Sequence, residues 1–174
     1  MLAITPQEKF KVKSIWEWEH VRAGKVIDKW KENNICTDEG LTALLDIMFS
    51  SGTQLTAWYV LIFETDTTPA AGTTYATPVW TECTAYDEAT REAWVEPGVV
   101  TKSITNSASK ASFTMNGTKT IYGAALVAGG TGAATKGDAA GGGKIYSASK
   151  FGTSKPVVAA DVLNVTVTLT AADV

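Results

Sequence analysis

The strictest pattern in this sequence is an alternation of apolar and polar residues over positions 162–171. Odd positions hold Leu163, Val165, Val167 and Leu169, and even positions hold Asn164, Thr166, Thr168 and Thr170. A period of two is that of a β-strand with one face buried. A strand this regular is normally paired into a sheet.

The N-terminal part of the sequence predicts a β-hairpin. Apolar residues of the segment 10–20 alternate with lysine and glutamate, and they are Phe10, Val12, Trp16 and Trp18. Ala23-Gly24 then has the composition of a tight turn, and residues 25–30 have that of a returning strand.

Residues 55–63 (LTAWYVLIF) are rich in β-forming residues and are apolar on both strand faces, which is typical of a strand covered on both sides. Further strands are predicted at 81–87, 91–95, 101–105, 111–115, 120–127 and 144–151. Within 120–127, Gly123 indicates a bulge or a close approach of another backbone.

One segment predicts a helix. Thr37 is a suitable N-cap, and Asp38 and Glu39 would place carboxylates in the first turn, where they complement the helix dipole. An apolar stripe at helical spacing follows, made of Leu41, Leu44, Leu45 and Met48. We expect this stripe to lie against a sheet, with a partner-binding helix as the alternative.

These patterns together predict a mainly β protein, a β-sandwich or jelly-roll-like domain of about nine short strands with one α-helix over about 37–50. No linker composition interrupts the chain, so residues 1–174 are expected to form a single domain, with 1–9 as an N-terminal arm. The Gly-rich segment 129–143 has no periodicity and is predicted to be an exposed, mobile loop.

Charge and hydropathy bear on possible partners. A net charge of −3 gives no electrostatic reason to expect nucleic acid or an anionic membrane. The first residues lack the basic start and apolar run of a signal peptide, and the longest apolar stretch is about half of a membrane span. We therefore expect no nucleic-acid and no membrane partner.

The sequence offers little that could bind a metal or cofactor. Cys36 and Cys83 are expected to be reduced core thiols, and His20 a polar or interface residue. A zinc site made from these three would need ligands at unrelated spacings. We predict no cofactor and no metal.

Motifs for catalysis are equally weak. The Gly-rich segment is not a Walker loop, because Lys144 is followed by Ile145 and a predicted strand. No G-x-S-x-G motif is present. One cluster of carboxylates consists of Glu82, Asp87, Glu88, Glu92 and Glu96. It could supply a general acid and a general base, as in a glycosidase. Alternatively, it could be a solvated or interface segment that pairs with Arg91. The second reading is preferred, and no enzyme is predicted.

Several segments, in this order, resemble small virion structural proteins of tailed bacteriophages and prophages. The resemblance covers roughly residues 25–170 and is carried by TDEGLTALLD (37–46), WYVLIFE (58–64), the loop 69–76, WTECTAYDEATREAW (80–94), SITNSASKASFTMN (103–116) and IYGAALV (121–127). It implies a decoration, cement or minor capsid protein that binds the major capsid protein and copies of itself. Such a protein is assembled in the bacterial cytoplasm and resides on the capsid surface. A tail or fibre component is the alternative, and a small carboxylate-dependent glycosidase is a weaker one.

A chain that works by surface contact needs anchor residues, and tryptophan, tyrosine and arginine are the usual ones. The sequence has six tryptophans, more than one small core usually needs. We therefore predict that some of these side chains are exposed in the monomer and buried between subunits, with Trp16, Trp18, Trp30, Trp80, Trp94 and Arg91 as the candidates.

Overall fold

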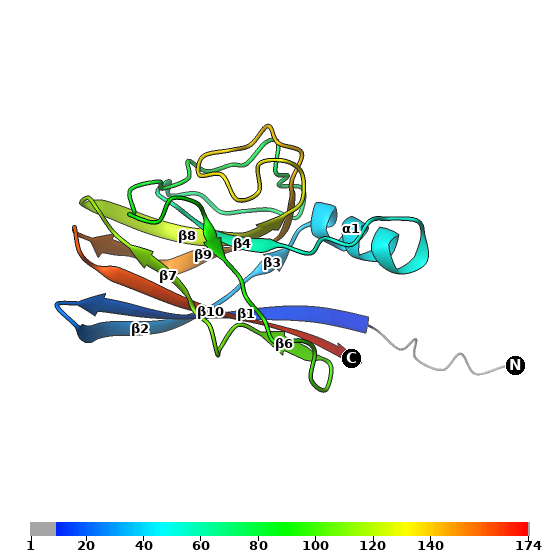
Figure 1. The fold of residues 1–174 in the computed structure, drawn as a ribbon, viewed down its shortest axis with the longest axis horizontal. Coiled ribbons are helices and arrows are strands. Elements are labelled where there is room, and N and C mark those ends of the chain that lie inside the picture. The colour runs from blue at the N-terminus through cyan, green and yellow to red at the C-terminus, as the bar shows by residue number, and fades with distance from the viewer. Residues whose placement is uncertain (1–9, 174) are drawn as a thin grey trace, which may run out of the picture.

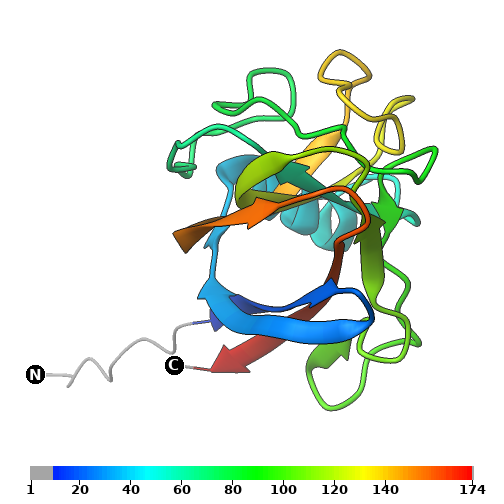
Figure 2. The same cartoon turned by 90° about the vertical axis from the view of Figure 1, so that its left-hand side faces the viewer.

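The computed structural model describes residues 10–173, and the predicted arm 1–9 lies outside the described residues. Two antiparallel sheets face each other (Figures 1 and 2). Sheet A has the order β2 (Lys25–Asn33), β1 (Phe10–Arg22), β10 (Val162–Asp173) and β6 (Ser103–Thr105), and β7 (Ala111–Thr114) also pairs with β10. Sheet B has the order β3 (Ile35–Cys36), β9 (Lys144–Val157), β8 (Lys119–Ala128), β4 (Trp58–Phe63) and β5 (Glu92–Ala93). The predicted mainly β sandwich is confirmed.

Strand β10 is paired into sheet A, as its alternation predicts, and lies at the centre of that sheet. It pairs with β1 on one edge and with β6 and β7 on the other. Leu163, Val165 and Val167 are fully buried between the sheets. Leu169, nearer the end of the strand, is only half-buried.

The predicted hairpin is β1 and β2. Ala23 and Gly24 join them with φ values of 49° and 74°, the two positive φ angles of a tight hairpin turn that matches the strand twist. The register places Trp18 opposite Trp30, so both indoles lie on the inner face of sheet A.

Strand β4 is covered on both faces, as predicted. Val60 and Ile62 belong to the core between the sheets. Leu61 and Phe63 point the other way and pack under loop residues Tyr75 and Trp80. The second cover is therefore a layer of loops, which Figures 1 and 2 show above sheet B.

Gly123 of β8 confirms both expectations for that position. The pairing of β8 with β9 shifts register between Ile121 and Gly123. A Cβ at Gly123 would lie 2.1 Å from the Phe63 ring and 2.2 Å from the Ser149 carbonyl oxygen, so only glycine fits.

Two strand predictions differ from the structure. The segment 81–87 is not a strand and makes only isolated bridges, from Glu82 to Phe63 and from Tyr86 to Met115. The short β3, which carries the chain from sheet A to sheet B, was not predicted. Two-residue strands have no periodicity that a sequence pattern can reveal.

Helix α1 (Asp38–Phe49) begins where the sequence predicts. The Thr37 side chain accepts a hydrogen bond from the Gly40 amide at 3.0 Å, and the Thr37 amide donates to the Tyr146 carbonyl of β9 at 3.1 Å. Glu39 accepts from the amides of Ile145 and Tyr75 at 2.8 and 3.0 Å. The first turn is thus fixed to the end of sheet B, and the rest of the helix projects beyond it (Figure 1).

Gly40 is what allows this close approach. A Cβ at Gly40 would lie 2.6 Å from the Tyr146 Cα. We expect Gly40→Ala to destabilise the fold by about 1–3 kcal/mol, because backbone overpacking outweighs the better helix propensity of alanine. Urea unfolding measures the change.

The control for this variant is Gly72→Ala, because the space around a Cβ at Gly72 is open. Its unfolding free energy should stay within about 0.5 kcal/mol of the parent. Equal costs for the two variants would contradict the role given to Gly40.

A buried carboxylate joins the ends of β1 and β10. Asp161 accepts hydrogen bonds from Arg22 Nε and Nη2, both at 2.7 Å, and from the Val158 amide at 2.9 Å. His20 Nε2 lies 2.8 Å from the same carboxylate. The hydrogen bonds from Arg22 are the largest influence and hold the pKa of Asp161 well below its usual range.

Asp161→Asn should therefore lower stability at pH 7 by about 1–3 kcal/mol. A depressed folded-state pKa gives stability that is present above the unfolded value, about 3.9, and is lost as pH falls further. The difference between parent and variant should shrink in acid, as measured by urea unfolding across pH 2–7. Glu17→Gln, which breaks the exposed pair with Lys31, should cost no more than about 0.5 kcal/mol.

Candidate functional site

The outer face of α1 is an exposed apolar surface. Leu41, Leu45, Met48 and Phe49 are 39, 59, 64 and 80% exposed. The prediction that the stripe lies against a sheet is therefore wrong for Leu41, Leu45 and Met48. The reason is that Gly40 fixes only the first turn to β9, so the later turns extend past the edge of the sheet.

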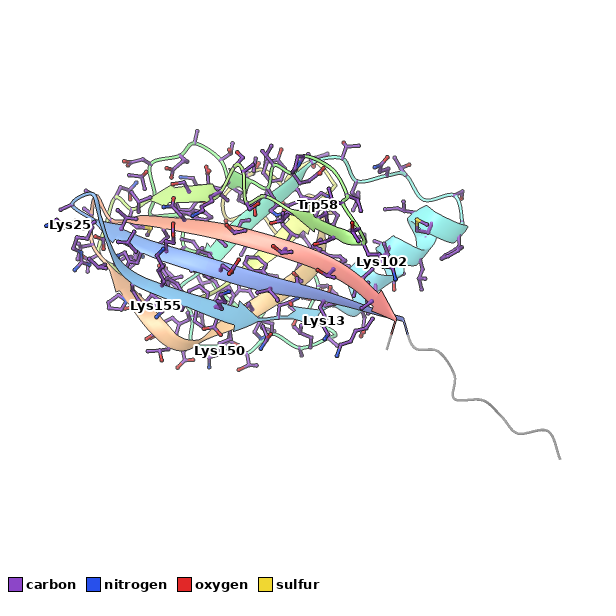
Figure 3. The ribbon with its side chains drawn as sticks, turned by 90° about the horizontal axis from the view of Figure 1, so that it is seen from below. Lys13, Lys25, Trp58, Lys102, Lys150 and Lys155 are labelled. Atoms are coloured by element: carbon purple, nitrogen blue, oxygen red, sulfur yellow. The ribbon has the colours of Figure 1, made fainter. Side chains whose placement is uncertain are left out.

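The inner face of α1 covers an apolar groove of about 370 Å³ at the end of the space between the sheets. Figure 3 labels Trp58 and Lys102 at this end, next to α1, and Lys25 at the opposite end. One wall is the helix and the other is the segment 99–104. The residues that line the groove are Val12, Gly40, Ala43, Leu44, Ile47, Leu55, Trp58, Trp94, Val99, Lys102, Ser103, Ile104, Leu126, Tyr146, Leu169, Thr170 and Ala171.

In the groove, the two indole N–H groups already donate hydrogen bonds to backbone carbonyls, and the Tyr146 hydroxyl stays protonated at neutral pH. The indole N–H of Trp58 donates to the Leu55 carbonyl at 3.2 Å, and that of Trp94 donates to the Val167 carbonyl at 3.1 Å. Burial raises the pKa of the Tyr146 hydroxyl, which therefore stays protonated. The groove can therefore bind an apolar group.

Three of the predicted interface tryptophans form a stack inside the molecule. Trp16 and Trp18 are 0 and 1% exposed, and Trp30 is half-buried. The ring centroids of Trp18 and Trp30 are 5.7 Å apart with nearly parallel planes, and Phe151 of β9 meets both rings edge-on. The prediction of exposed anchors is wrong for Trp16 and Trp18, because β1 turns both indoles into the core.

Trp80 and Trp94 are buried as well, so the same prediction is wrong for them. Trp80 stacks on Phe63 of β4 at 4.9 Å, beneath the loop layer. Trp94 lies on the floor of the groove and is 6% exposed. Of the predicted tryptophans, Trp94 alone belongs to the groove, and it shares the floor with Trp58, which the sequence analysis did not select.

Arg91, the remaining predicted interface residue, is only 1% exposed. Its guanidinium donates to Glu82 through Nε and Nη2, the latter at 2.6 Å, and to the Tyr75 hydroxyl through Nη1 at 2.8 Å. It also donates to the carbonyls of Ala133 and Asp138. The predicted pairing of the acidic segment with Arg91 is confirmed for Glu82, but within one chain rather than at an exposed interface.

The Arg91 network anchors the Gly-rich segment 129–143. The Arg91 amide donates to the Ala134 carbonyl at 2.8 Å, and the Gly137 amide donates to Glu82 at 3.0 Å. The hydrogen bond from the Tyr75 hydroxyl lowers the pKa of Asp138, which accepts it. A buried guanidinium needs acceptors, and the carbonyls of this segment supply them. The prediction of an exposed loop is wrong for Gly132, Ala133 and Gly143, which are buried, and is confirmed for exposed residues such as Thr131 and Gly142. The mobility of the segment stays a prediction.

Removing this cation should destabilise the loop layer. We expect Arg91→Met to cost about 3–5 kcal/mol, because it leaves the buried Glu82 carboxylate without its partner. Hydrogen–deuterium exchange should rise in residues 133–138, and urea unfolding gives the free energy.

The matched variant is Arg91→Met with Glu82→Gln, which removes both charges. It should cost clearly less than the sum of the two single substitutions, because the residues are directly coupled. Additive costs would contradict the network.

The other carboxylates of the acidic segment bind backbone rather than a cleft. Glu88 accepts from the Thr114 amide at 3.0 Å, and Glu92 accepts from the Ser112 amide at 3.3 Å. Burial, with the nearby charge of Glu88 as a lesser cause, raises the pKa of Glu92. Neither residue lines the groove or the smaller pocket beside Arg91. This geometry does not favour the glycosidase alternative.

The three candidate metal ligands lie in separate parts of the structure. His20 pairs with Asp161, Cys83 is buried in the core, and Cys36 is half-buried beside Val12. Residues 10–173 contain no group of three or more His, Cys, Asp or Glu side chains that could hold a metal ion. Over the same range, no helix is both long and apolar enough to cross a membrane.

Comparison with known proteins identifies no relative: no family model, curated protein or solved structure matches this chain.

One feature of the sequence could have indicated the groove and the exposed face of α1. Residues 41–49 (LTALLDIMF) are apolar on two helical faces, one with Ala43, Leu44 and Ile47 and one with Leu41, Leu45 and Met48. A surface helix that packs on a sheet needs only one such face. The second face indicates a helix with a further contact to make.

Proposed function

We propose that this protein is a structural component of a tailed-bacteriophage particle, which decorates or cements the capsid shell through contacts between subunits. Its partners would be the major capsid protein and copies of itself, on the capsid surface, after assembly in the host cytoplasm. The proposal begins from the resemblance of residues 25–170 to virion structural proteins.

The observation that carries the proposal is the exposed apolar face of α1, with Leu45, Met48 and Phe49 each more than half exposed. Apolar side chains gathered on one side of a protein mark contact surfaces. The segment 99–104 adds Val99 and Val100, which are 70 and 71% exposed, on the other side of the groove. A rigid sandwich that presents such a surface at one end suits a protein whose role is to bind a neighbour.

The buried chemistry supports the same view. Both oxygens of Glu82 accept from Arg91, and Asp161 accepts from Arg22 and Val158. These charges hold loops and strand ends together, which is what a protein under mechanical and thermal load in a particle requires.

The direct test is binding of the purified protein to expanded capsid shells that lack it. We expect saturable binding with a fixed number of copies per shell and a higher melting temperature of the shell. Absence of shell binding, with co-purification on tails instead, would overturn the capsid role in favour of the tail alternative.

The contact surface is tested with paired serine variants. Leu45→Ser with Met48→Ser should reduce shell binding at least tenfold, because it removes exposed apolar area while leaving the core unchanged. Val26→Ser with Ile27→Ser is the control, since Val26 and Ile27 are 49 and 51% exposed on β2, next to Lys25 at the end opposite α1 (Figure 3). Equal losses from the two pairs would contradict the role of α1.

A further inference from the structure

The wall of the groove opposite α1 contains a strained turn. The backbones of Val100 and Ser103 hydrogen-bond to each other at 2.7 and 3.0 Å, and Thr101 and Lys102 between them have φ values of 48° and 62°. Two-residue turns of this kind usually hold Asn-Gly or a similar pair, because a positive φ is unfavourable for residues with a Cβ. Backbone strain is concentrated at functional sites, so this turn marks the wall as a candidate contact.

Both walls of the groove expose apolar side chains, and the exposed area suits a pair of copies. These side chains are Leu41, Leu45, Met48 and Phe49 on α1, and Val99 and Val100 beside the turn. Their exposed fractions together equal nearly four whole residues. At ~200 Å² per residue this is roughly 750 Å² per copy, and an interface of standard size buries about 800 Å² per partner. The α1 end of one copy can therefore supply half of a stable dimer interface.

The two walls also carry opposite charges. Helix α1 contains Asp38, Glu39 and Asp46 and no lysine or arginine, whereas the segment 99–104 contains Lys102 and no acidic residue. Asp46 and Lys102 are both exposed. Two α1 helices laid against each other would bring like charges together, but α1 laid against the turn of another copy brings opposite charges together. Charge therefore favours contact between the helix of one copy and the turn of the other.

The positions of these residues allow the contact to form twice in one dimer. Asp46 and Phe49 are three positions apart on α1 and so are neighbours on its surface. Phe49 is 80% exposed, and the groove of about 370 Å³ has an aromatic floor of Trp58 and Trp94. If Phe49 of one copy enters this groove in another, Asp46 approaches the wall that carries Lys102, next to α1 (Figure 3). A twofold axis repeats the same contact in the other direction.

We propose that the α1 ends of two copies form a twofold dimer. Phe49 of each copy fills the groove of the other, and Asp46 of each copy faces Lys102 of the other. The role of this dimer in a particle rests on the proposed function, because the dimer assigns the α1 surface to contacts between copies of this chain. The pairing itself needs no shell and is tested on the isolated protein.

Sedimentation equilibrium of the full-length protein should show a concentration-dependent dimer and no larger species, because a twofold contact closes on itself. Phe49→Ser should weaken this dimer at least tenfold, since it removes the side chain that fills the groove. Val26→Ser with Ile27→Ser is the control: both side chains are about half exposed, and they lie near Lys25 at the opposite end of the molecule (Figure 3). This variant should dimerise like the parent.

The charged pair allows a sharper test. Asp46→Lys and Lys102→Glu should each weaken the dimer at least tenfold, because each variant alone places like charges together at both contacts. An equal mixture of the two variants should dimerise about as tightly as the parent, since each contact of the mixed dimer then joins a lysine to an acidic residue. Mixing could not repair a folding defect in either variant.

A filled groove should also change the surroundings of its floor. The indole N–H NMR signals of Trp58 and Trp94 should shift on dilution, while that of Trp16 in the closed core should not. A parent protein that stays monomeric or grows beyond a dimer would overturn the proposal, as would a mixture of the charge variants that stays monomeric. A monomer that binds shells would refute the dimer alone, and a dimer that does not bind shells would refute the capsid role alone.

Discussion

The structure depends on how the space between the two sheets is filled by the indoles of Trp16 and Trp18. Both come from inner positions of β1 and are essentially inaccessible to solvent. Large aromatic side chains gain most from burial when they meet stacked or edge-on partners. Trp16 stacks on Trp18, and Trp18 in turn stacks on Trp30 of β2 and meets Phe151 of β9 edge-on. The aromatic cluster thereby links the edge of sheet A to sheet B, and β3 can carry the chain across beside it.

The aromatic rings fill the middle of the space between the sheets, and α1 covers one end of that space. Because Gly40 lets α1 approach the backbone of Tyr146, the first turn fits tightly, and the later turns have no sheet beneath them. The groove and the exposed outer face are two results of the same close contact. A helix with a bulkier residue at this position would have to stand away from β9 and could not close this end in the same way.

The elements that could be predicted from sequence are those with local periodicity. The alternation of β10, the Ala23-Gly24 turn of the hairpin and the two-sided apolar character of β4 all depend on neighbouring residues, and each prediction is confirmed. The alternation of β1 already places Trp16 on the apolar face of its strand, and the prediction of an exposed anchor came from the number of tryptophans, which does not distinguish a core aromatic from an interface one. The position of Arg91 could not be predicted. The acceptors of Arg91 come from residues such as Glu82 and Ala133, which only the folded chain brings together.

The pairing of β1 with β10 joins the first and last strands of the sheet, from Phe10 with Asp173 to Val21 with Val162. Such distant pairing closes a very long loop, which is typical of slow folding. During synthesis the hairpin of β1 and β2 leaves the ribosome long before its central neighbour exists. Its tryptophan-bearing face therefore stays without its sheet neighbour until residues 162–173 have been made.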